Sequence, residues 1–66
     1  MNRDAQIAAL NSRAIAYEEA ALCSYDTNII QGFCEAAQGL RDEAERLKTD
    51  TEYELPSKVR RELGLL

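Results

Sequence analysis

The chain has 66 residues, of which 45% are hydrophobic and 30% charged, and it carries a formal net charge of −4 at pH 7. This balance excludes an intrinsically disordered tail, and the length allows one compact domain whose small core a second copy or a partner surface could complete. Ala, Leu and Ile dominate the apolar residues, so we expect helices and no sheet.

The N-terminal twenty residues contain Asp4, Gln6 and Asn11, so they lack the continuous apolar stretch of a signal peptide. No run of about 18 apolar residues suggests a membrane span. We therefore expect a cytoplasmic protein in which Cys23 and Cys34 are reduced, partly buried thiols. Without histidine these two residues do not form a four-ligand zinc site, and we expect neither metal nor cofactor.

The first predicted helix covers residues 3–24, with Asn2 as N-cap and Asp4 at the positive end of the helix dipole. At about 100° per residue its apolar positions share one broad side. These positions are Ile7, Leu10, Ala14, Ile15, Tyr17, Ala21, Leu22 and Tyr25.

Short polar side chains from Ser24 to Asn28 favour a turn after this helix. The second predicted helix covers residues 28–48, with Asn28 as N-cap and Gln31 reaching back to it in a capping box. Its apolar residues occupy about a third of the circumference and its opposite side is strongly polar. The apolar residues are Ile30, Phe33, Ala36, Ala37, Leu40, Ala44 and Leu47.

An acidic loop is expected at residues 49–55 and a third, short helix at residues 56–63, because Pro56 suits a first helical turn and Gly64 a C-terminal stop. Two turns are not stable alone, so this helix should dock against the two longer ones. The residues expected to make this contact are Val59, Leu63 and Leu66. The sequence thus predicts an all-α, three-helix bundle made of a long helical hairpin plus a short C-terminal helix.

Charge is unevenly distributed, because residues 18–54 hold ten acidic residues against three basic ones, a net charge of −7. A segment of this kind repels nucleic acid and attracts basic surfaces. An equally weighted alternative is an ordinary solvated helix face, since Asp42 and Arg46, and Glu45 and Lys48, are spaced to form ion pairs.

The loop sequence Asp50-Thr51-Glu52-Tyr53-Glu54 contains no basic residue, so we expect its charge not to be neutralised locally. Spaced carboxylates beside a tyrosine could imitate the phosphates and base of a nucleic acid. Alternatively, the segment is a linker and Tyr53 packs on the core.

Asn11 and Glu18 lie seven residues apart within the apolar side of the first predicted helix. Burying an unpaired Glu18 would cost about 2 kcal/mol or more, so its carboxylate must be exposed, paired or held for a partner. Either the helix serves one intramolecular and one intermolecular surface, or Glu18 pairs with Arg60 or Arg61 of the third helix.

Gly32 and Gly39 also lie seven residues apart, on one flank of the second predicted helix, and each costs about 1 kcal/mol relative to Ala. Close approach of another helix, in the same chain or in a second copy, would compensate for this cost. Chance placement on a tolerant surface is the alternative. Asn11, Glu18, Gly32 and Gly39 are therefore candidates for an oligomer interface.

No nucleophile with an activating base, paired-carboxylate cleft or phosphate-binding loop can be assembled, so we expect no enzymatic activity and no catalytic residues. The small size, the acidic segment 18–54 and the loop 50–54 resemble the small, acidic, all-helical inhibitors of bacteriophages, of which the anti-CRISPR proteins are the best-known group. This resemblance implies an inhibitor, in the host cytoplasm, that blocks the DNA-binding or docking surface of a basic host protein or nucleoprotein complex without binding nucleic acid or membrane. The expected contacts are Asp42, Glu43, Glu45, Asp50, Glu52, Tyr53 and Glu54.

The competing hypothesis is a self-associating regulatory or scaffolding module, in which two hairpins form a homodimeric four-helix bundle. A DNA-binding regulator that uses Lys58, Arg60 and Arg61 is disfavoured, because this basic patch is short and the rest of the chain repels phosphate.

Overall fold

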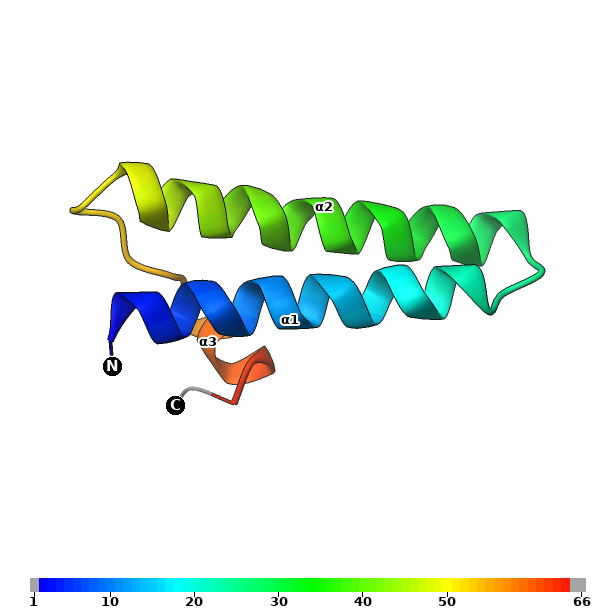
Figure 1. Ribbon diagram of the computed structural model, residues 1–66, viewed down its shortest axis with the longest axis horizontal. Coiled ribbons are helices and arrows are strands. Elements are labelled where there is room, and N and C mark those ends of the chain that lie inside the picture. Colours follow the sequence, from blue (N-terminus) through cyan, green and yellow to red (C-terminus); the bar gives the residue numbers. More distant parts are fainter. Residues whose placement is uncertain (1, 65–66) are drawn as a thin grey trace.

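The structure is a computed structural model that describes residues 2–64. Three helices make up its secondary structure: α1 (Arg3–Leu22), α2 (Thr27–Thr49) and α3 (Ser57–Glu62). α1 and α2 lie side by side as a long antiparallel hairpin, and the described range contains no strand (Figure 1). The all-α class is confirmed, and each predicted helix end lies within two residues of the observed one.

The starts of α1 and α2 are capped by side chains. The Asn2 side chain accepts the N–H of Asp4 at 2.7 Å, so the predicted N-cap of α1 is confirmed. The N-cap of α2 is Asp26, whose carboxylate accepts the N–H of Asn28 at 2.9 Å. The prediction that Asn28 is the N-cap is therefore wrong. Asp26 lies two residues earlier, its carboxylate satisfies the free N–H of Asn28, and its negative charge suits the positive end of the helix dipole. Gln31 instead donates to Glu35 at 3.3 Å.

The hydrophobic core lies at the end of the hairpin where α1 begins and α2 ends. Its buried members are Leu10, Ala44, Leu47 and Leu55. Around them pack the half-buried side chains of Ile7, Leu40, Tyr53, Val59 and Leu63. Leu10 and Leu47 are the largest fully buried side chains in the described range, so the core is small.

α3 is attached to this core through the loop that precedes it. Leu55 is only 3% exposed, and Val59 of α3 and Leu63, the C-cap of that helix, contact the core as predicted. Gly64, with φ of 73°, supplies the predicted stop in the left-handed region. Leu66, the third predicted contact, lies outside the described residues.

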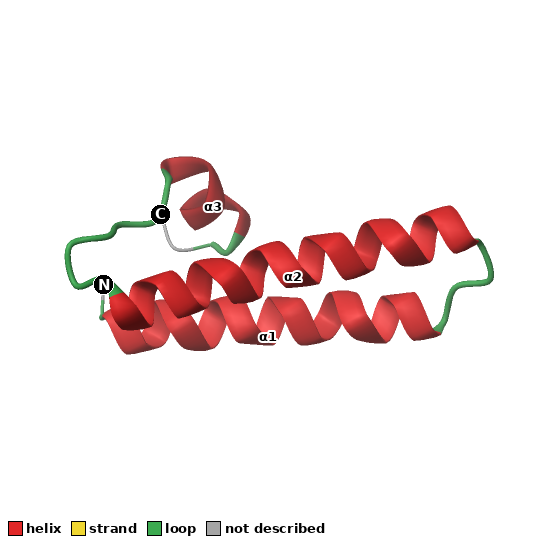
Figure 2. Ribbon diagram, turned by 90° about the horizontal axis from the view of Figure 1, so that it is seen from above, coloured by secondary structure: helices red, strands yellow, loops and turns green. Residues whose placement is uncertain are grey.

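The opposite end of the hairpin, near the turn between α1 and α2, is poorly covered. Leu22 is 87% exposed and Tyr25 is completely exposed, although both share the predicted apolar side of the first helix. α3 is six residues long and lies at the other end of the hairpin (Figure 2). Near the turn, α2 alone covers α1, and it covers only part of that apolar side.

Candidate protein-interaction surface

The predicted contact residues of the second helix do not form a single cluster. Asp42 and Glu45 are exposed, whereas Glu43 is half-buried. Glu43 lines a groove shared with α3, and Glu45 lines a groove on the other side of α2, beside Asn11. The predicted ion pair between Asp42 and Arg46 is not formed in the described range, where Asp42 accepts a hydrogen bond from Gln38 at 2.9 Å.

Tyr53 is held in the loop by three kinds of contact. Its hydroxyl donates a hydrogen bond to the Glu43 carboxylate, and its ring packs on the core. The guanidinium carbon of Arg46 lies 4.5 Å from the ring centroid, in cation–π geometry. The hydrogen bond to Glu43, together with burial, raises the pKa of Tyr53 above its ordinary value of 10.0. Tyr53 is therefore an anchor of the loop, as the alternative interpretation predicts, and not a freely presented ring.

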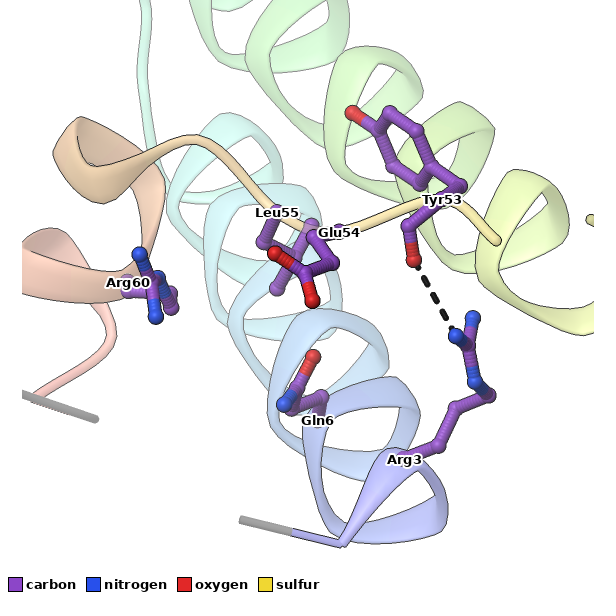
Figure 3. A pocket seen from close by; sticks show the side chains of 6 residues that line it. All are labelled: Arg3, Gln6, Tyr53, Glu54, Leu55 and Arg60. Carbon is purple, nitrogen blue, oxygen red and sulfur yellow. Dashed lines mark hydrogen bonds between the residues drawn. The ribbon is translucent and has the colours of Figure 1, made fainter. Parts of the chain in front are cut away.

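Arg3 of α1 organises the backbone of the acidic loop. Its guanidinium donates to the carbonyl of Leu47 at 2.9 Å, of Asp50 at 3.1 Å, of Thr51 at 2.7 Å and of Tyr53 at 3.1 Å. Figure 3 shows the last of these bonds. Arg3 and Arg46 therefore both contact the loop, but Arg3 binds backbone carbonyls and Arg46 the Tyr53 ring, and neither pairs with a loop carboxylate within residues 2–64. The sequence did not predict the contacts of Arg3. A cation is favoured at the C-terminus of a helix, but the carbonyls that Arg3 binds are 44 to 50 residues away in the sequence, so no local pattern links them to Arg3.

The loop carboxylates remain on the surface. Asp50, Glu52 and Glu54 are exposed, and Asp50 also accepts the N–H of Glu52 at 3.0 Å in a local turn. Glu54 lines a cavity of about 250 Å³. The other residues around this cavity are Arg3, Gln6, Tyr53, Leu55 and Arg60 (Figure 3). The structure thus brings Glu52 and Glu54 onto a loop with an organised backbone, at the end of α2.

Glu18 pairs with Arg41 across the hairpin, so the predicted pairing with Arg60 or Arg61 is wrong. Glu18 is 48% and Arg41 40% exposed, so the pair is a surface ion pair. α3 lies against the other side of α1, where Arg13 donates to the carbonyl of Glu62 at 3.1 Å. Asn11, near the Glu18–Arg41 pair, lines a shallow groove with Arg41.

The two helix glycines are exposed, and within residues 2–64 a Cβ at Gly32 or Gly39 would meet no atom within 4 Å beyond the adjoining backbone of α2. Close approach of another helix of the same chain is therefore excluded as their explanation. Both cysteines are free and exposed, which corrects the expectation of partly buried thiols.

Within residues 2–64, no group of three potential metal ligands lies together. None of the helices there combines the length and the apolarity needed to cross a bilayer.

Comparisons of the chain with protein-family models, with curated proteins and with solved structures found no match.

Proposed function

We propose that the protein is a non-enzymatic inhibitor that docks on a basic host protein or nucleoprotein complex through the carboxylates of α2 and the following loop. The observation that supports this proposal most is the ordered backbone of the loop that carries Glu52 and Glu54. Arg3 holds four carbonyls of the α2 C-terminus and loop, and Tyr53 is tied to Glu43 and Arg46. A binding loop that is already ordered loses less conformational entropy when a partner docks.

The charge of this region supports a basic partner. Glu52 and Glu54 are exposed carboxylates, and neither is in an ion pair within residues 2–64. Carboxylates of this kind steer an acidic protein towards a positively charged groove and repel the phosphates of a nucleic acid. The resemblance to anti-CRISPR proteins adds the proposed site of action, the DNA-binding or docking surface of a CRISPR surveillance complex.

The structure also refines the set of contacts that we propose. Asp42, Glu45, Asp50, Glu52 and Glu54 have exposed side chains, whereas Glu43 and Tyr53 bond to each other. We therefore assign the partner contacts to the exposed group and a positioning role to Glu43 and Tyr53.

The test is competition between the purified chain and target DNA for a purified CRISPR surveillance complex, at several salt concentrations. The variant E52K/E54K reverses two loop charges and leaves Asp50, which bonds the loop backbone, in place. We expect its affinity to fall by about tenfold or more, with a weaker salt dependence than that of the parent chain.

The matched control is E19K/E35K, which makes the same change in net charge at exposed positions on α1 and α2. Its affinity should fall much less, because neither side chain is among the proposed contacts. An equal loss in both variants, or no loss in either, would contradict the proposed role of the loop. Far-UV circular dichroism verifies that both variants are folded.

A further inference from the structure

Within residues 2–64, one side of the hairpin has no helix packed against it. We call this side the open face and define it by Ile15, Glu18 and Leu22 of α1 and Ile30, Cys34 and Arg41 of α2. In Figure 1 α1 passes in front of α3, and Figure 2 shows α3 to one side of the two long helices. The contacts of α3 with α1 lie around Ala9, Arg13 and Ala16, on the other side of that helix.

The open face carries an apolar groove near the turn between α1 and α2. The groove has a volume of about 480 Å³. The residues that line it are Glu18, Ala21, Leu22, Ser24, Ile30 and Cys34. Next to it on α1, Ile15 is 48% exposed, and Leu22 in the groove is 87% exposed. Large apolar side chains are thus gathered on a side that no part of the described chain covers.

The core is thinnest in the same part of the hairpin. The buried residues there are the alanines Ala14, Ala21 and Ala37, whereas Leu10 and Leu47 lie at the opposite end. The accessible surface is 4760 Å², against about 4,200 Å² for a folded monomer of 7.4 kDa. The hairpin thus exposes more surface than a compact monomer of this mass.

The area of the open face is sufficient for a dimer. Two helices that are about 30 Å long and about 10 Å in diameter present a face of roughly 600 Å² in projection. A standard protein interface buries about 800 Å² of accessible surface on each partner. The accessible surface of the open face is larger than its projected area, because side chains project from it. The available area and the area that a standard interface needs are therefore of the same order.

Charge favours a second copy of the chain as the occupant. Besides the apolar groove, the open face includes the shallow groove lined by Asn11 and Arg41. The charged residues that line these two grooves are Glu18, Arg41, Glu45 and Lys48. These two acids and two bases sum to zero, although the whole chain carries −4. Two copies of the chain therefore repel each other at the acidic loop but not at the open face. A basic partner is attracted to the acidic loop and not to the neutral open face.

We propose that the open face is the interface of a homodimer with two-fold symmetry. Two hairpins then form a four-helix bundle, and each α3 lies on its outside. Leu22, Ile15 and Ile30 fill the seam of this bundle. The acidic loop is not part of the interface, whereas Glu45, one of the proposed partner contacts, lines a groove of the open face. The two proposals remain distinguishable, because E52K/E54K changes loop residues alone and I15K/L22K changes residues of the open face alone.

Molar mass measured by sedimentation equilibrium over a range of concentrations tests the dimer directly. We expect the mass to rise from that of one chain, 7.4 kDa, to twice this value. A mass of one chain at every concentration up to about 1 mM, where even a millimolar complex is well populated, would overturn the proposal.

Paired variants of α1 test the location of the interface. I15K/L22K places two charges in the open face, and A5K/S12K places the same charges at exposed positions that line neither groove. We expect the first variant to weaken dimerisation by about 100-fold, because a lysine in an apolar seam loses its hydration. The second should change it by about threefold or less. Equal dimerisation of the two variants would overturn the assignment of the open face.

The two native thiols provide a test that needs no variant. Cys34 lines the apolar groove, whereas Cys23 is exposed outside it. As the protein concentration rises through the dimer transition, alkylation of Cys34 by iodoacetamide should slow in proportion to the dimer fraction, and alkylation of Cys23 should not. A constant rate at Cys34 while the mass doubles would place the interface elsewhere and overturn the proposal. Peptide mass spectrometry separates the two signals.

Discussion

At the residue scale, Arg3 connects the beginning of α1 to the end of α2 and the loop. One guanidinium supplies hydrogen bonds to four carbonyls, among them that of Leu47 in the last turn of α2. Its positive charge also suits the negative end of the α2 dipole. A lysine has the same charge but lacks the planar fork that reaches several acceptors at once.

We therefore predict that R3A lowers the free energy of unfolding by about 1–3 kcal/mol, measured by urea denaturation. R3K should recover only the part that depends on charge, about 0.3–1 kcal/mol. The control is R61A, since Arg61 is exposed on α3 and its side chain makes no hydrogen bond or ion pair in the described range. Equal effects of R3A and R61A would contradict the role assigned to Arg3.

Tyr53 leads to a prediction about pH. Glu43 accepts its hydroxyl proton in a hydrogen bond, and this bond raises the pKa of Tyr53 in the folded state. The neutral hydroxyl is thus favoured by folding, and its contribution to stability is complete below the unfolded pKa near 10. The contribution is lost as the pH rises through the folded pKa.

Y53F should therefore be less stable than the parent chain at pH 7, by about 0.5–1.5 kcal/mol, and this difference should shrink as the pH rises above 10. Urea denaturation at several pH values measures it. Y25F is the control, since Tyr25 is completely exposed, and it should match the parent chain throughout. A difference between Y53F and the parent chain that stays constant with pH would contradict the hydrogen bond.

At the element scale, the hairpin depends on where α2 begins. Asp26 has extended backbone angles, with φ of −93° and ψ of 118°, and its carboxylate binds the N–H of Asn28. Asn28 is therefore already inside the first helical turn, where its side chain caps nothing. The four short polar residues Ser24, Asp26, Thr27 and Asn28 offered several caps, and only the path of the chain from α1 selected one of them.

We predict that D26A lowers the free energy of unfolding by about 1 kcal/mol, whereas N28A changes it by a few tenths at most. D26N keeps an accepting oxygen and should lie between the parent chain and D26A. Thermal denaturation monitored by circular dichroism measures all three. A larger loss in N28A than in D26A would restore Asn28 as the N-cap.

At the scale of the whole molecule, the fold is asymmetric along its long axis. One end has the leucine core, the Arg3 contacts and α3, and the other end has buried alanines and the apolar groove of the open face. Leu55 is central to this asymmetry, because its buried side chain anchors the loop that brings α3 back to the hairpin. Its burial is not predictable from the sequence, since a single leucine between Glu54 and Pro56 has no periodicity to reveal it.

L55A should lower the free energy of unfolding by about 2–5 kcal/mol, most of the stability that a domain of this size has. Urea denaturation at a protein concentration below the proposed dimer transition measures the loss. L22A is the control, because Leu22 is the same residue type but is 87% exposed, and its effect on the monomer should be within about 0.5 kcal/mol. A cost for L55A as small as that for L22A would contradict the position of Leu55 in the core.

The sequence by itself determined the three helices and, within two residues, their ends, although it did not select the N-cap of α2. Helical hydrogen bonds join residues four apart, and the caps and stops at Asn2, Pro56 and Gly64 act over a few residues, so all of these are encoded locally. The sequence also predicted that Val59 and Leu63 contact the core, because a helix as short as α3 is unstable without such a contact.

Only the tertiary structure decided which charges meet and which apolar residues stay exposed. Arg3 reaches the loop, and Glu18 pairs with Arg41, because the hairpin brings together residues that are far apart in the sequence. The side of α1 to which α3 returns determines that Ile15 and Leu22 are uncovered. A helical projection shows the angle of a residue around its own helix, but the neighbour at that angle follows from the packing of the whole chain.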